Sequence, residues 1–163
     1  MTSAETNLRT GENAVAKIEE LESQFPSAPA TQYASILKGD ILYFNGKFAE
    51  ASKVYEEALA KAGPETKPFA LANLGLSLEA AGEHARAAEK IREFLDQYPE
   101  HFLAPQAHLN LALAQEALGS LEAKTTYEKI SILYPETEWA REAQERVKAL
   151  PPPKVEAPLT PKP

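Results

Sequence analysis

The feature that most constrains this chain is a period of 36 residues that holds in three columns of the sequence. One small residue and two larger ones recur at positions i, i+4 and i+7. The columns are Ala51, Ala87 and Ala123; Tyr55, Ile91 and Tyr127; and Ala58, Phe94 and Ile130. This spacing follows one face of a helix, so the pattern predicts three copies of the same amphipathic helix.

A second helix is predicted before each of these three, and a glycine closes it. Glycine tolerates the left-handed conformation that ends a helix, so each glycine predicts a tight turn between two helices. The turn glycines are Gly46, Gly82 and Gly119. Seven residues upstream stand small residues that predict close helix crossings, namely Gly39, Gly75 and Ala112. Proline ends the later helix of a pair at Tyr98-Pro99 and Tyr134-Pro135.

Composition limits both the fold and the partners. Apolar residues make up 44% of the 163 residues, and Ala, Leu, Glu and Lys dominate the middle of the chain, which favours helices over strands. The net charge of -7 argues against a nucleic-acid surface. No apolar run approaches the ~18 residues of a membrane span, so a soluble chain without a membrane span is expected. With no cysteine, disulfides and thiolate ligands are excluded.

The repeat also predicts where the domain begins and ends. Residues 1–10 are expected to be a flexible segment, and residues 11–150 a single repeat domain. Within it we expect a half repeat at 11–31, full repeats at about 32–67, 68–104 and 105–138, and a closing helix at 139–150. Residues 151–163 contain six prolines and are expected to form an extended tail. A half repeat without its partner helix would expose apolar surface, which suggests either a longer protein or a dimer through this end.

These helix pairs resemble tetratricopeptide repeats, whose usual length is about 34 residues. The residues that carry the resemblance are Leu74-Gly75, the turn glycines Gly46 and Gly82, Phe48 after the first turn, and the closing prolines Pro99 and Pro135. Lys38 departs from the pattern where a leucine is expected. The resemblance implies an all-α fold, a right-handed α-solenoid of stacked antiparallel helix pairs with about seven helices.

A narrower resemblance is to repeats of bacterial cell-envelope proteins. It rests on the two extra residues per repeat and on the Tyr-Pro endings. The types in question are Tol-Pal-associated proteins, outer-membrane assembly lipoproteins and membrane-anchored proteins with periplasmic repeats. This resemblance favours a periplasmic or envelope location, and the cytoplasm stays the alternative.

Stacked helix pairs leave a concave face, built from the first helix of each pair, on which the family binds peptides. The resemblance assigns twelve partner-binding residues to this face. They are Tyr33, Leu37, Asp40 and Tyr43 in the first full unit; Phe69, Asn73, Leu76 and Glu79 in the second; and Gln106, Asn110, Leu113 and Glu116 in the third.

Asn73 and Asn110 occupy equivalent positions on this face. A side-chain amide can donate to and accept from an extended peptide backbone at once, so the pair could form two rungs of a ladder. Alternatively, each amide satisfies a neighbouring helix group or water. Trp139, at the start of the last helix, either closes the stack or anchors an interface, and we favour the closing role.

No catalytic or cofactor chemistry is indicated. The histidines His84, His101 and His108 lack the i, i+4 spacing of a helical metal pair, and no glycine-rich phosphate loop occurs. We therefore predict no enzyme activity, no cofactor and no metal. The favoured function is a scaffold that binds a segment of another protein. The alternative is an assembly protein that oligomerises through its terminal helices, and a chaperone-like holdase is a more remote one.

Overall fold

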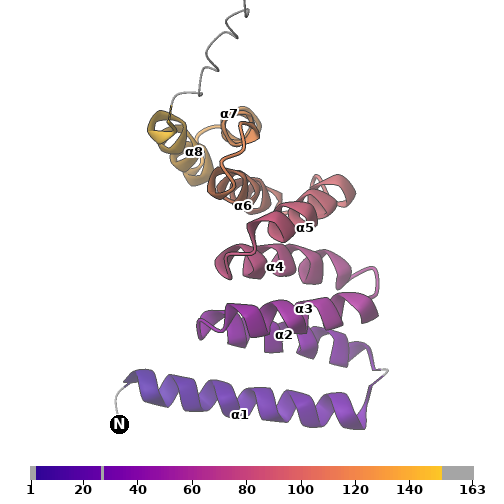
Figure 1. Ribbon diagram of the computed structural model, residues 1–163. Helices are drawn as coiled ribbons and strands as arrows, with labels where there is room; N and C mark the ends of the chain where they lie inside the picture. Colours follow the sequence, from indigo (N-terminus) through magenta and orange to yellow (C-terminus); the bar gives the residue numbers. More distant parts are fainter. Residues whose placement is uncertain (1–2, 27, 152–163) are drawn as a thin grey trace, which may run out of the picture.

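The computed structural model describes residues 3–26 and 28–151, with side chains from residue 11 onward. The described residues form eight α-helices and no strands, in agreement with the expected stack of about seven helices (Figure 1). The helices are α1 (Ser3–Gln24), α2 (Pro29–Phe44), α3 (Phe48–Lys61), α4 (Lys67–Ala80), α5 (His84–Gln97), α6 (Ala104–Ala117), α7 (Glu122–Leu133) and α8 (Glu138–Ala149). The predicted all-α stack of antiparallel helix pairs is confirmed. The proline-rich residues after Pro151 lie outside the described part.

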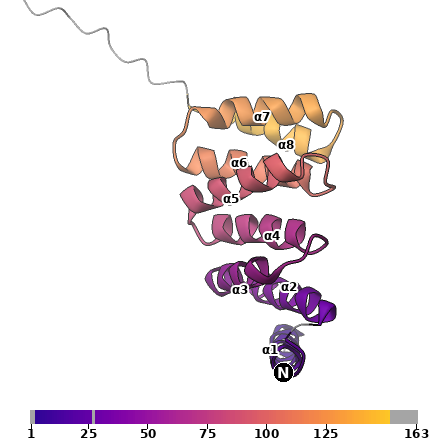
Figure 2. The ribbon, with the colours of Figure 1, turned by 90° about the vertical axis from the view of Figure 1, so that its right-hand side faces the viewer.

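The helices stack one after another along the chain, from α1 at one end to α7 and α8 at the other (Figure 2). Each helix packs mainly against its neighbours in sequence. We call α2, α4, α6 and α8 the first helices and α1, α3, α5 and α7 the second helices. All nine residues of the predicted columns are buried, and Tyr55, Phe94 and Tyr127 are almost fully so.

The turns within the pairs form as the glycines predict. Gly46, Gly82 and Gly119 all have positive φ, between 67° and 80°. In each turn the N–H after the glycine donates to a carbonyl five residues back at 2.9 Å, as from Lys47 to Leu42. This is the Schellman pattern that ends a helix at a left-handed residue. The third turn is longer: α7 begins three residues after its glycine, whereas α3 and α5 begin two residues after theirs.

The N-terminal helix differs from the prediction. Residues 1–10 were expected to be a flexible segment, but α1 already begins at Ser3. A methyl group added at Gly11 would stand 2.9 Å from the amide of Asn45, at the end of α2. From Gly11 onward α1 therefore runs beside α2, and residues 3–10 continue the helix beyond the end of α2.

Both ends of the stack present mostly polar surfaces. On α1, the described side chains that face solvent are Glu12, Asn13, Ala16, Lys17, Glu19, Glu20, Ser23 and Gln24. On α8 they are Glu138, Arg141, Glu142, Gln144, Glu145, Lys148 and Ala149. Repeat stacks need terminal units with a polar outer face, and α1 and α8 meet that need. Within the expected half repeat, Phe25, which directly follows α1, is 54% exposed, so part of the expected apolar surface is present.

Candidate partner-binding face

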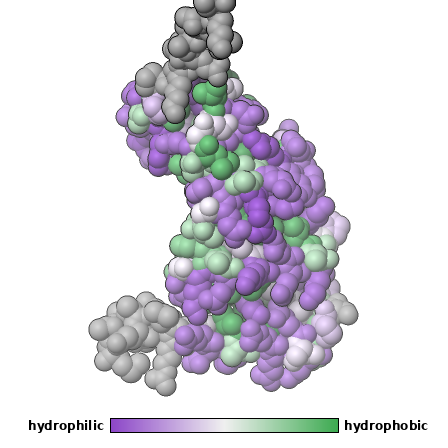
Figure 3. Space-filling model, in the orientation of Figure 1, coloured by the Kyte–Doolittle hydropathy of each residue, from purple (hydrophilic) through white to green (hydrophobic). Residues whose placement is uncertain are grey.

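The first helices lie closer together than the second helices. Backbone contacts join α2 to α4, α4 to α6 and α6 to α8, whereas α1, α3, α5 and α7 make no such contacts with one another. The side formed by the first helices is therefore the inner side of the curved stack, and we call it the inner face. Figure 3 shows one view of the surface, in which hydrophobic residues occur as separate patches among hydrophilic ones.

At the N-terminal end of the inner face, α2 presents two large apolar side chains. Tyr33 is 49% exposed and Leu37 is 53% exposed, so neither belongs to the core. The Tyr33 hydroxyl donates to Glu65 at 3.0 Å, and this hydrogen bond raises the pKa of the phenol. Both residues were predicted to bind a partner, and their exposure leaves them available for that role.

Asp40 is the polar centre of the first unit. It accepts a hydrogen bond from the Tyr55 hydroxyl at 2.5 Å and one from the Asn73 amide at 3.0 Å. Burial and this carboxylate both raise the pKa of Tyr55. Asp40 thus links α2 to α3 and α4, and the Asn73 amide already has an acceptor within the protein.

The third unit uses its amides differently. Asn110 is only 5% exposed, and its oxygen accepts from the Gln106 amide at 2.9 Å. Gln106 in turn accepts from the Trp139 indole N–H at 3.0 Å. Trp139 packs on the cluster formed by α6, α7 and α8, which supports its closing role. Asn73 and Asn110 each already form a hydrogen bond within the protein. Their binding of a peptide backbone therefore stays a prediction.

The remaining predicted residues are partly buried. Tyr43 and Phe69 pack against the larger core cluster, and Leu113 packs against the smaller one. Leu76 and Glu79 are partly buried as well. Burial, followed by the charge of Glu79, raises the pKa of Tyr43, which places these two groups near each other. Glu116 accepts from the Tyr127 hydroxyl at 2.6 Å and lies 3.7 Å from Arg146.

One part of this surface has no counterpart in the sequence prediction. His101 and Phe102, in the loop before α6, stack with ring centroids 4.5 Å apart, and Phe69 meets His101 edge-on at 5.4 Å. Phe102 is 69% exposed. In the sequence, Phe102 is an aromatic residue outside the 36-residue columns, so the repeat pattern assigns it no role.

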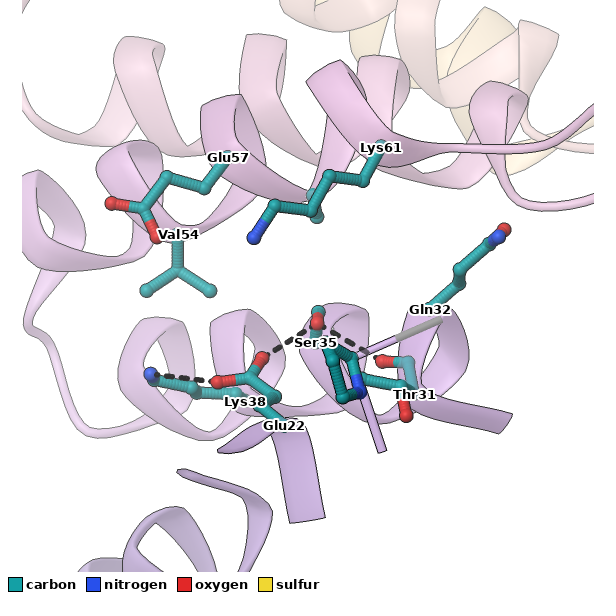
Figure 4. Close-up of a pocket in the computed structure, with 10 residues that line it drawn as sticks. Glu22, Thr31, Gln32, Ser35, Lys38, Val54, Glu57 and Lys61 are labelled. Carbon is teal, nitrogen blue, oxygen red and sulfur yellow. Dashed lines mark hydrogen bonds and ion pairs between the residues drawn. The ribbon is translucent and has the colours of Figure 1, made fainter. Parts of the chain in front are cut away.

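Two hollows lie on the other side of the stack, between successive second helices. One, of about 230 Å³, is lined by α1, α2 and α3 (Figure 4). Glu22 accepts from Ser35 there at 2.6 Å and pairs with Lys38. The other, of about 600 Å³, lies between α5 and α7 above α6. Neither lining brings together a nucleophile, a base and an orienting group.

His108 lies in the floor of the larger hollow. It is 7% exposed, its Nδ1 has no hydrogen-bond partner, and its ring packs near Tyr134. Burial, with a smaller contribution from Lys129, lowers its pKa to about 4. The folded state therefore holds a neutral imidazole.

The buried imidazole predicts a loss of stability in mild acid. An unfolded histidine has a pKa of about 6.5, so the contribution of His108 is complete above that pH and is lost as the pH falls towards 4. At pH 5 we expect a loss of about 2 kcal/mol in the free energy of unfolding, measured by urea titration. His108→Gln should remove this loss. Equal losses in wild type and variant would show that other groups cause it.

The described residues show neither a metal site nor a membrane-spanning helix. The described residues contain no group of three or more His, Asp or Glu side chains placed to hold a metal ion. None of the described helices combines the length and the apolar character that crossing a membrane requires.

Comparison with solved structures finds the same fold in three proteins. A putative kinesin light chain with nearly identical TPR-like repeats from Podosopora anserina is 17% identical, with a TM-score of 0.68 over 90% of this chain and 82% of its own. A tetratricopeptide repeat protein from Parabacteroides merdae is 21% identical, with a TM-score of 0.67 over 91% and 60%. BtubC (BKLC) from P. vanneervenii is 17% identical, with a TM-score of 0.53 over 96% and 78%. At these identities the likeness concerns the fold alone.

Comparison at the level of sequence gives the family. No curated protein sequence matches the chain. The profile described as "Tetratricopeptide repeat" matches residues 36–102 and 74–123, which together make up more than half of the chain. These ranges include α3, α4, α5 and α6 completely and the C-terminal half of α2. The protein therefore belongs to the tetratricopeptide repeat family.

Proposed function

We propose that this protein is a non-catalytic interaction module whose inner face binds a segment of another protein. The observation that carries the proposal is the exposure of Tyr33 and Leu37, two large apolar side chains side by side on one turn of α2. Phe69 on α4 and Phe102 beyond it extend the apolar surface. Large exposed apolar groups on a repeat stack are typical of a surface that a partner covers.

The outward surfaces of α1 and α8 give little support to the alternative function. Assembly through the terminal helices needs apolar end faces that copies of the chain can share. The outward residues of α1 and α8 are mainly charged or polar, whereas Leu121, Ile132 and Leu133, on or beside α7, are exposed apolar residues at the C-terminal end. A monomer in light scattering is the expected result, and an oligomer lost on altering α1 would favour assembly instead.

Site-specific crosslinking tests the proposed face. A photo-crosslinking amino acid at position 37 should capture a partner protein from the native source, and Tyr33→Ala in the same chain should weaken the capture. The matched control places the crosslinker at Ile132, which is 78% exposed on α7, on the other side of the stack. Capture of the same proteins from positions 37 and 132 would contradict a specific inner face.

Alanine substitution of Asn73 and Asn110 would be a less specific test of the inner face. Because Asn73 and Asn110 each hydrogen-bond within the protein, their loss would disturb the fold as well as a binding surface. The location of the partner stays a proposal too. An envelope site rests only on the Tyr-Pro endings and the repeat length, and fractionation of native cells would test it.

A further inference from the structure

Charges are distributed unevenly between the two sides of the stack. The first helices α2, α4 and α6 contain only two lysines or arginines, Lys38 and Lys67. Lys38 faces α1, where it pairs with Glu19 at 2.9 Å. Lys67 is the first residue of α4, about 18 Å along the helix from Glu79. Lys38 is thus the one cation in the C-terminal halves of these three helices, and it is paired with α1.

The same helix halves carry one carboxylate each. We call Asp40, Glu79 and Glu116 the acidic row, one residue from each of α2, α4 and α6. One hydrogen bond relates the row to a neighbouring unit: Asp40 accepts from Asn73 of α4 at 3.0 Å. The charge of Glu79 contributes, after burial, to the raised pKa of Tyr43 on α2. Arg146 of α8, 3.7 Å from Glu116, marks the C-terminal limit of the row.

Of the three carboxylates in the acidic row, that of Glu79 is the most available to a ligand. Asp40 receives two internal hydrogen bonds, and Glu116 receives one and lies beside a cation. Glu79 is partly exposed and forms no hydrogen bond or ion pair with the described side chains. A half-exposed carboxylate beside apolar groups is stabilised when a cation on a ligand approaches it.

Two ion pairs join successive second helices across the outer side. Arg86 of α5 pairs with Glu56 of α3, and Arg92 of α5 pairs with Glu122 of α7 at 2.7 Å. Carboxylates and cations are nearly equal in number on α3, α5 and α7. On the inner face, by contrast, Lys38 and Lys67 lie away from the three carboxylates of the acidic row.

We propose that the partner segment on the inner face is basic and apolar, with lysine or arginine next to aliphatic or aromatic side chains. Apolar groups of the segment cover Tyr33 and Leu37, and its cations meet the acidic row. Along α2 the rise from Leu37 to Asp40 is about 4.5 Å, which lies between the spacing of residues one apart and two apart in an extended peptide. This inference rests on the proposed function and specifies the partner's charge.

Labelled peptides of defined charge test this inference by fluorescence anisotropy. The probes are leucine-containing peptides of about twelve residues in which every other position is lysine, glutamine or glutamate. We expect the lysine peptide to bind, the glutamine peptide to bind about tenfold more weakly, and the glutamate peptide not to bind. Binding of the lysine peptide should weaken as salt is added.

Matched variants separate a specific site from general attraction by the net charge. Glu79→Gln should weaken binding of the lysine peptide about fivefold, whereas Glu57→Gln, on the exposed surface of α3, should leave it unchanged. Equal losses in the two variants would overturn the inference. So would a lysine peptide that fails to bind at millimolar concentration, or a glutamate peptide that binds as well. Specific crosslinking at position 37 would still support the proposed function in these cases.

Discussion

Replacing Phe94 by alanine should lower the free energy of unfolding by about 4 kcal/mol. Phe94 is fully buried on α5, in the larger core cluster, and its ring lies 5.7 Å from Tyr98 and 5.6 Å from His101. Removing it deletes an aromatic ring from the middle of the stack and leaves a cavity that helices on both sides border. Urea or thermal unfolding followed by circular dichroism measures the loss.

Two control variants define the cause of this loss. Phe94→Leu keeps most of the buried volume and should cost less than half as much. Ile132→Ala removes an aliphatic side chain that is 78% exposed and should change stability by no more than about 0.5 kcal/mol. A small effect of Phe94→Ala would show that the helices close around the missing ring, and the core would be more deformable than its packing indicates.

The same substitution has a consequence for the inner face. His101 packs edge-on against Phe94 and stacks on Phe102, so the aromatic edge of the face depends on a core residue. Phe94→Ala should therefore shift the NMR signals of His101 and Phe102 even where the variant stays folded. Stability and the shape of the candidate binding surface are coupled through this residue.

Most of the fold could be predicted from the sequence because the repeat is local. Helix periodicity, turn glycines and closing prolines act over a few residues, and the turns at Gly46 and Gly82 formed as predicted. The start of α1 was not predicted. Residues 3–10 contain few apolar residues, so no helical stripe marks them, and a frayed segment and the first turns of a helix look alike in the sequence.

The polar contacts of the candidate face could not be predicted in the same way. Asn73 and Asn110 are equivalent in sequence, yet their partners differ. Asn73 donates to Asp40, 33 residues earlier, but the residue equivalent to Asp40 in the next unit is Leu76. Asn110 therefore has no carboxylate across the helix interface and bonds to Gln106 within its own helix. Which amide is free depends on pairs of residues in different units.

Substitution of Gly39 by alanine tests the helix crossings, because two effects of opposite sign compete. Alanine favours a helix over glycine by about 1 kcal/mol, so propensity alone predicts a gain. A Cβ at Gly39 would stand 2.4 Å from the ring of Tyr55, which is almost fully buried and holds Asp40. Since Tyr55 cannot move without breaking that hydrogen bond, we expect a net loss of about 3 kcal/mol, measured by urea unfolding.

The third unit supplies the control for this prediction. Ala112 occupies the position equivalent to Gly39 and is fully buried against α7. Ala112→Gly should cost about 1 kcal/mol from helix propensity, together with a small term for the lost methyl group. Gly39→Ala and Ala112→Gly would then both destabilise the protein, although they are opposite exchanges. If Gly39→Ala stabilised it instead, α2 and α3 would have room to separate, and the glycine would not be what brings them close.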